Sequence, residues 1–328
     1  MKTILVPVDG SHFAEQALRY AHILARVLDA QVHLLEVIPD LERERMRIDS
    51  LTLVYAGELA SEQMRLTHDA AIALRNHTES YLQSLAEPLQ AHDIQTKVHV
   101  HFGHAAEEIR ILANDIQADL IVMATHGYGG IKRWTLGSVA DKVIHATNIP
   151  VLLIRGDDQL PLRHLELRRL LVPLDGSALS SQALPLAQDL AEKANAKIIL
   201  LYAVDPVSET LPSVGMDGAI FSMSVDERSN HTMPEISAAL EERRERAVQS
   251  LEHMLGTMGN MKQRSVAVSV VGYPAEIIVD EAERRQVDLI VMATHGYSGI
   301  KRWALGSVAD KVLHSTQTPL LLIRVSHV

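Results

Sequence analysis

Short apolar runs alternate along the first half of the chain with segments that have helical periodicity. The run from Thr3 to Val8 is apolar and rich in β-branched residues, as in a buried strand. After the break at Asp9-Gly10-Ser11, alanine and leucine recur between residues 14 and 28 at the three- and four-residue spacing of an amphipathic helix. The same reasoning predicts the other elements of this half: strands at 31–37, 96–101, 119–124 and 150–155, helices at 59–89, 105–112 and 137–146, and a loop at 40–57.

This order of elements predicts an α/β fold. Strands that alternate with helices pair in parallel through right-handed crossovers. The most apolar strands contain Val6 and Ile121 and belong at the centre, whereas Lys97, His99 and His101 indicate a strand near an edge. We therefore expect a Rossmann-like, doubly wound, five-stranded parallel sheet in the order 3-2-1-4-5, with helices on both faces. Ligands of such sheets bind beyond the carboxyl ends of the central strands, where the chain direction reverses.

The chain contains this pattern twice. Residues 118–155 and 287–324 are identical at 30 of 38 positions, and the stretch around Asp9-Gly10-Ser11 recurs as Asp175-Gly176-Ser177. The offset between the copies is 166 residues at Asp9 and Asp175. It increases to 169 residues at Gly127 and Gly296. We expect two domains, 1–155 and 168–328, joined by a linker at 156–167. The second copy repeats the strands, at 169–174, 197–203, 265–270, 288–293 and 319–324.

Composition narrows the function classes. The 328 residues include no cysteine, which excludes disulfide scaffolds, zinc–thiolate sites and thiol nucleophiles. The formal net charge of −10 argues against a nucleic-acid partner. The sequence shows no signal peptide and no apolar stretch of about 20 residues, so we expect a cytoplasmic protein with no membrane contact. The histidines show no HExxH spacing, and no metal site is predicted.

The candidate chemistry lies in a glycine-rich loop after the fourth strand of each copy. In the first copy the loop runs from Gly127 to Gly137-Ser138, where a helix begins. The unpaired N–H groups at the start of a helix favour phosphate, and a serine hydroxyl adds a donor. Alternatively, the glycines only shape a turn and Ser138 only caps the helix. Duplication of the loop at the reversal point of the sheet favours ligand binding.

Two further motif residues leave alternatives open. Asp9 and Asp175 follow the first strand of each copy, where an aspartate can accept hydrogen bonds from a ribose, hold a metal, or form an Asx-turn or helix cap. His126 and His295 precede the loop glycines. A loop histidine without a carboxylate partner visible in the sequence is more often a hydrogen-bonding residue than a catalytic one, and we predict no catalytic residue.

Together these residues resemble the universal stress protein family in its tandem two-domain form. The family pattern has an Asp after the first strand, then Gly, two residues, Gly, nine residues and Gly-Ser/Thr. Here Gly127 is followed after nine residues by Gly137-Ser138. The first glycine of the pattern is replaced by Ala124 and, in the second copy, by Ala293, which we expect to weaken nucleotide binding without abolishing it.

The resemblance implies one nucleotide site in each copy. In the first copy its residues are Pro7, Val8, Asp9, Val37, Ala124, His126, Gly127, Gly137, Ser138 and Val139. In the second copy they are Pro173, Leu174, Asp175, Ala203, Ala293, His295, Gly296, Gly306, Ser307 and Val308. The implied ligand is ATP, alone or with Mg²⁺, with ADP and AMP as alternatives.

The resemblance also implies a regulatory function. We expect a nucleotide-binding stress-response protein that acts through unknown protein partners. In this family the last strand commonly mediates dimerisation, so residues 151–154 and 320–323 would pair within one chain as a pseudo-dimer, which leaves a homodimer open. The alternatives are a slow ATPase, for which the loop lacks the GxxxxGK[ST] arrangement, and a scaffold or small-molecule carrier that binds no nucleotide.

Overall fold

The chain forms two compact units, residues 1–165 and 166–328. The computed structural model describes residues 2–39, 57–125, 136–155, 166–206, 233–294 and 305–324, with side chains for all of these except 57–68 and 233–236. The loop expected at 40–57 and the linker expected at 156–167 lie almost entirely outside the described residues. The exact domain boundaries expected from the sequence therefore stay predictions.

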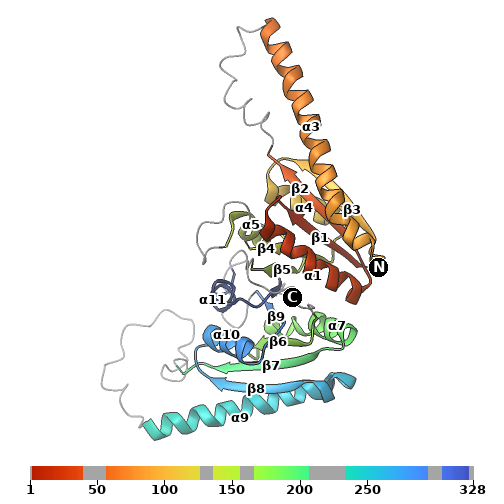
Figure 1. Cartoon of the computed structure of the whole chain (residues 1–328). Coiled ribbons are helices and arrows are strands. Elements are labelled where there is room, and N and C mark those ends of the chain that lie inside the picture. Colours follow the sequence, from red (N-terminus) through yellow and green to blue (C-terminus); the bar gives the residue numbers. More distant parts are fainter. Residues whose placement is uncertain are drawn as a thin grey trace, which may run out of the picture. The chain divides into compact units, whose positions relative to one another are not determined.

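Unit 1 is a parallel sheet covered by helices (Figure 1). Its strands pair in the order β3-β2-β1-β4-β5, which confirms the expected order. The strands are β1 (Lys2–Val8), β2 (Ala30–Ile38), β3 (Thr96–Phe102), β4 (Leu120–Ala124) and β5 (Val151–Ile154). The helices are α1 (His12–Leu28), α3 (Gly57–Gln90), α4 (Ala105–Asp115) and α5 (Ser138–Ala146).

Unit 2 repeats this architecture in the order β8-β7-β6-β9-β10, again with parallel pairing. Its strands are β6 (Arg169–Leu174), β7 (Lys197–Val204), β8 (Val266–Val271), β9 (Leu289–Ala293) and β10 (Leu320–Ile323). Its helices are α6 (Ala178–Ser181), α7 (Leu184–Ala194), α9 (Met233–Thr257), the 3₁₀ helix η2 (Gly259–Arg264), α10 (Pro274–Arg284) and α11 (Ser307–Ser315).

Aliphatic side chains form the core of each sheet, since aromatic residues make up only 4% of the chain. The central strands are the most buried: Ile4, Leu5 and Ile121 are completely inaccessible to solvent, as are Leu170 and Leu171 of unit 2. The outer strand β3 is only partly covered. The expected division into central and edge strands is therefore confirmed. The carboxyl ends of the buried central strands lie at the same edge of each sheet.

The first helix differs between the units. In unit 1, α1 is continuous, begins at the Ser11 side chain, which accepts a hydrogen bond from the Ala14 N–H, and ends at Asp29 in the left-handed conformation. In unit 2 the corresponding segment is broken into α6 and α7, and Pro185 stands in the first turn of α7. Proline has no N–H and its ring crowds the carbonyl four residues earlier, so it favours a break in the helix here.

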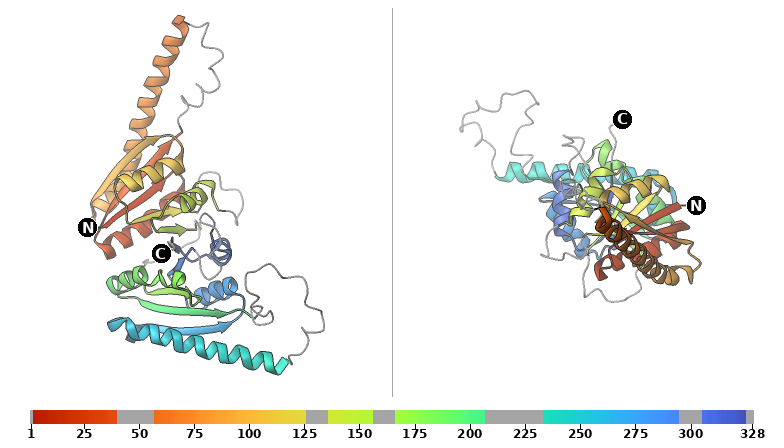
Figure 2. Two further views of the ribbon diagram at one scale, coloured as in Figure 1. Left: turned by 180° about the vertical axis from the view of Figure 1, so that it is seen from behind. Right: turned by 90° about the horizontal axis from the view of Figure 1, so that it is seen from above.

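The helices before the third strand are the longest elements of both units. In unit 2, α9 lies along β7 and β8 (Figure 2). In unit 1, α3 packs on β2 and β3 with its C-terminal part, while its N-terminal part extends beyond the sheet (Figures 1 and 2). Within the described ranges, none of these helices combines the length and the apolar character needed to cross a membrane.

Candidate functional site

A cavity of about 560 Å³ opens at the carboxyl edge of the unit 2 sheet. Residues from the ends of β6, β7 and β9 line it together with residues of α6, α9, α10 and α11. Of the ten site residues predicted for the second copy, eight line this cavity: Pro173, Leu174, Asp175, Ala203, Ala293, Gly306, Ser307 and Val308. The other two, His295 and Gly296, lie outside the described residues.

The aspartate after the first strand forms a tight turn in both units. The Asp175 Oδ1 atom accepts hydrogen bonds from the Ser177 N–H, at 3.0 Å, and from the Ser177 hydroxyl, at 2.6 Å. In unit 1, Asp9 makes the same two bonds to Ser11, at 3.1 and 2.6 Å. The Asx-turn considered for this residue is therefore present. It fixes the carboxylate at the end of the strand, where Asp175 also lines the cavity.

The glycine between the aspartate and the serine has a conformation that other residues avoid. Its φ angle is +76° at Gly10 and +80° at Gly176. No atom lies within 4 Å of a Cβ built on Gly10, so glycine is required there for its backbone and not for space.

A backbone hydrogen bond closes the glycine-rich loop in each unit. The Gly306 N–H donates to the Thr294 carbonyl at 2.8 Å, which joins the end of β9 to the start of α11. In unit 1, Gly137 and Thr125 make the same bond at 2.7 Å. The N-cap residue of α11 is Gly306, and no side chain caps this end. The first N–H groups of α11 therefore face the cavity edge at the positive end of the helix dipole.

The two alanines that replace the family glycine are ordinary strand residues. Ala293 pairs with Ile323 in β10 and Ala124 pairs with Ile154 in β5, and both alanines are buried. Since Ala293 lines the cavity, its methyl group occupies space that a glycine would leave open.

The structure places most of the unit 1 residues at the equivalent edge. Pro7 and Val8 end β1, Asp9 follows it, and Val37 lies near the end of β2. Gly137, Ser138 and Val139 begin α5, where Ser138 is exposed. His126 and Gly127 lie outside the described residues.

Several lining residues of the unit 2 cavity were not predicted. Tyr202 precedes the predicted Ala203, and Arg243 comes from α9, Pro274 and Ile278 from α10. Tyr202 and Ala203 are neighbours in β7, where successive side chains point to opposite faces, so the pattern that selects Ala203 does not select Tyr202. Nothing in the sequence indicates that Arg243, a helix residue 68 positions after Asp175, reaches this edge, because that depends on how α9 packs on the sheet.

Comparison with known proteins identifies the family. A model of the universal stress protein family matches residues 1–155 and 166–324, which covers both copies. The chain belongs to the universal stress protein family. A universal stress protein of Mycolicibacterium smegmatis is 25% identical over 324 residues, which are 98% of this chain and 96% of that protein. Universal stress protein G of Escherichia coli O157:H7 is 32% identical over 157 residues, which are 47% of this chain and 99% of that protein.

A solved structure supports the tandem fold. A universal stress protein from Archaeoglobus fulgidus superimposes with a TM-score of 0.63 at 19% identity, over 98% of each chain. The expected family and fold class are thus confirmed, and single-copy members such as the Escherichia coli protein correspond in length to half of this chain.

This universal stress protein carries a polar cluster beside the candidate site of unit 1. His33 Nδ1 lies 2.9 Å from His99 Nε2 across β2 and β3, and His101 Nδ1 lies 2.9 Å from Glu108 Oε2 of α4. Burial lowers the pKa of His33 to about 4, with His99 and Lys97 adding to the effect, and burial also lowers the pKa of His99. Among the described residues, no group of three or more histidines and carboxylates has the arrangement of a metal site.

The cluster has no equivalent in unit 2. The strand registers and the two offsets align each of its residues with an aliphatic one: Ile199, Val268, Val270 and Ile277. The two copies are therefore conserved in the loop and turn motifs but differ in the side chains around them.

Proposed function

We propose that this universal stress protein binds an adenine nucleotide at the carboxyl edge of one or both units and acts as a regulatory stress-response protein. The observation that carries the proposal is the unit 2 cavity, whose lining contains the turn aspartate, the end of the second strand and the start of α11. Its volume of about 560 Å³ suits a ligand of nucleotide size, since pockets for such ligands measure about 300–1,000 Å³.

Each part of the lining suits one part of a nucleotide. The apolar group around Leu174, Ala203 and Ile278 provides contacts for the flat face of adenine. The Asp175 carboxylate can accept from ribose hydroxyls, as carboxylates near the first strands of Rossmann-like sheets do. Gly306 and Ser307 bring backbone N–H groups and a hydroxyl to the phosphates at the start of a nine-residue helix.

The described residues support binding more directly than catalysis. The cavity lining contains no histidine, cysteine or lysine among the described residues, and its titratable groups are Asp175, Tyr202, Asp205 and Arg243. Slow ATP hydrolysis remains an outcome to measure, with phosphate release as its signal.

Equilibrium dialysis of the full chain with ATP, ADP, AMP and cAMP tests the proposal. We expect saturable binding of at least one adenine nucleotide below millimolar concentration. Ala203→Trp, which puts an indole ring where adenine would lie, should remove binding to unit 2, whereas Glu192→Gln on α7, outside the cavity lining, should not change it. Absence of binding by all four ligands at millimolar concentration would reject the proposal and favour a scaffold or carrier.

A further inference from the structure

The duplicated site differs at one register position of the second strand. Glu36 of β2 pairs with Val8, and Tyr202 of β7 pairs with Leu174. Val8 and Leu174 are equivalent in the two copies, so Glu36 occupies the position of Tyr202. Because Tyr202 lines the unit 2 cavity, the unit 1 site has a carboxyl group where the unit 2 site has a neutral phenol.

The surroundings of Glu36 are unusual for a carboxyl group. Its Oε2 atom is shielded from solvent and has no hydrogen-bond partner within the described part of the chain. Burial raises the pKa of Glu36, and the nearby Asp9 raises it further, while His77 acts in the opposite direction. An unpartnered buried acceptor is unfavourable, so a rotation that turns this carboxyl group toward a hydrogen-bond donor of a ligand would relieve an existing penalty.

More carboxylate groups gather around the same point in unit 1. The Tyr81 hydroxyl of α3 donates to Glu15 Oε1 at 3.0 Å, and the charges of Glu15, Glu36 and Asp9 all help to raise the pKa of Tyr81 after burial. The equivalent of Glu15 in unit 2 is Ser181, which carries no charge. The unit 2 lining instead includes the cationic Arg243 together with Asp175 and Asp205.

We propose that Glu36 is a specificity-determining residue that makes the unit 1 site prefer a nucleoside over a polyphosphate. The inference rests on the proposed function. The carboxylate accepts a hydrogen bond from a hydroxyl or amino group of the nucleoside and repels the negative charge of a triphosphate. The unit 2 site, with Tyr202 and Arg243 at its edge, accepts the triphosphate. At an effective dielectric constant near 20, any one charge within about 10 Å of a phosphate would change affinity by roughly tenfold or more.

Titration calorimetry of full-length variants at pH 7.5 tests this inference one site at a time. Ala203→Trp blocks unit 2 so that unit 1 is measured, and Val37→Trp, at the equivalent position of β2, blocks unit 1 so that unit 2 is measured. The quantity compared is the Kd for ATP divided by the Kd for adenosine. We expect this ratio to exceed 1 in unit 1 and to be below 1 in unit 2.

Replacement of the carboxyl group should change the ratio. In the Ala203→Trp background, Glu36→Gln should lower it by about tenfold, and Glu36→Tyr should bring it close to the unit 2 value. Glu87→Gln, which removes an exposed carboxylate near the far end of α3, is the matched control and should leave the ratio unchanged.

Native mass spectrometry without the blocking substitutions provides a second measurement if a blocked variant does not fold. At one ATP concentration, the original chain should carry one ATP and Glu36→Gln should carry two. An unchanged ratio or stoichiometry in Glu36→Gln overturns the inference, as does failure of unit 1 to bind either ligand, even when ATP binds unit 2. Absence of nucleotide from both units would instead overturn the proposed function.

Discussion

The imidazole rings of His33 and His99 stack with their centroids 5.0 Å apart and share one hydrogen bond between Nδ1 and Nε2. Such a bond requires a donor on one ring and an acceptor on the other, so both rings cannot be protonated while it persists. His33 is 3% exposed, and its Nε2 atom has no partner among the described residues. Burial lowers the pKa of both rings, which favours the neutral form of each inside unit 1.

Acid should destabilise unit 1 through this pair. The folded-state pKa of His33 is about 4, below its ordinary value of 6.5, so the unfolded chain binds a proton between these values and the folded unit does not. The contribution of His33 to the free energy of unfolding is fully present above pH 6.5. It is lost as the pH falls toward 4, by up to about 3 kcal/mol. Urea unfolding at several pH values should show this loss.

The residue at the equivalent position of unit 2 indicates which substitution to use in this experiment. Ile199 is the unit 2 equivalent of His33, and His33→Ile should flatten the pH dependence between 6.5 and 4. His253→Gln removes an exposed histidine of α9 and should leave it unchanged. An equally steep loss in His33→Ile would show that other groups cause the acid sensitivity.

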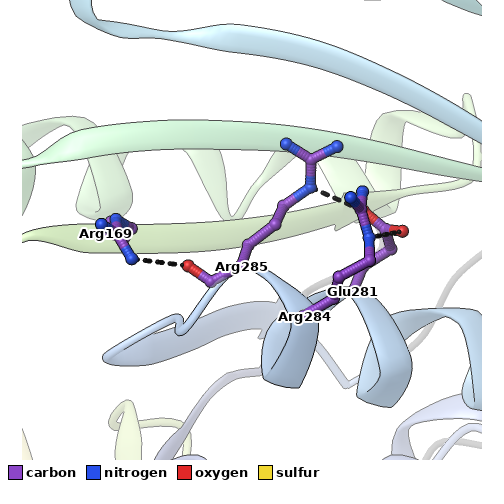
Figure 3. Close-up of polar contacts among 4 residues, drawn as sticks. All are labelled: Arg169, Glu281, Arg284 and Arg285. Atoms are coloured by element: carbon purple, nitrogen blue, oxygen red, sulfur yellow. Dashed lines mark hydrogen bonds and ion pairs between the residues drawn. The ribbon is translucent and has the colours of Figure 1, made fainter.

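Glu281 is predicted to stabilise unit 2 as a buried acceptor for two arginines (Figure 3). It is 7% exposed and accepts from Arg284 Nε and Nη2, at 2.9 and 2.6 Å, and from Arg285 Nε at 2.6 Å. Glu281→Gln should lower the free energy of unfolding by about 2 kcal/mol, because charge-assisted bonds are lost from a buried group. Arg284→Ala removes a partner that is 60% exposed and should cost less than about 1 kcal/mol.

The hydrogen bonds of Glu281 also predict the sign of a pH effect. The bond to Arg284 is the largest cause that lowers the pKa of Glu281 below its ordinary value of 4.5, and Arg285 adds to it. The contribution to stability is therefore present above pH 4.5 and declines as the pH falls below it. If Glu281→Gln unfolds at the same urea concentration as the original chain at pH 7, these bonds do not stabilise the unit.

The turn glycines should resist replacement for conformational reasons. Gly176→Ala places a side chain at a φ of +80°, which should cost about 1–2 kcal/mol, although only a Tyr202 ring carbon lies within 4 Å of the new Cβ, at 3.7 Å. Gly256→Ala, in α9 and with no atom within 4 Å, is the control and should stabilise by up to about 1 kcal/mol. Equal effects of the two variants in thermal unfolding would contradict this explanation.

Pairing of the two last strands within one chain stays a prediction that the absence of cysteine makes easy to test. Leu152→Cys and Leu321→Cys put one thiol in each last strand of a chain that otherwise has none. Mild oxidation of the double variant should give an intrachain disulfide that changes mobility on a non-reducing gel. Interchain dimers would indicate a homodimer through these strands instead, and the absence of any crosslink would contradict both arrangements.

The fold could be predicted closely from the sequence because the pattern of apolar and polar residues within each segment indicates its secondary structure and its burial. Apolar runs such as Thr3–Val8 specify central strands, and the polar residues of 96–101 specify an outer one. Pro185 indicates the break between α6 and α7, but only when the residues before it are already expected to be helical.

Side chains brought in by packing could not be predicted in the same way. Arg243 reaches the cavity because α9 lies on β7 and β8. The spacing of Glu281 and Arg285 is visible in the sequence, but the burial of Glu281 depends on how α10 packs. The equivalence of Glu36 with Tyr202 could be read from the duplicated sequence. That its Oε2 atom has no hydrogen-bond partner among the described residues depends on the helices that cover it. Local motifs thus indicate the candidate site, while the charges around it depend on tertiary contacts.

A crystal structure of the full chain grown with millimolar ATP would show whether and where the nucleotide binds. We expect adenine against Ala203 and Ile278, the ribose at Asp175, and phosphate oxygens within hydrogen-bond distance of the N–H groups that begin α11. A unit 2 cavity without nucleotide at that concentration, or ATP bound away from these residues, would contradict this expectation.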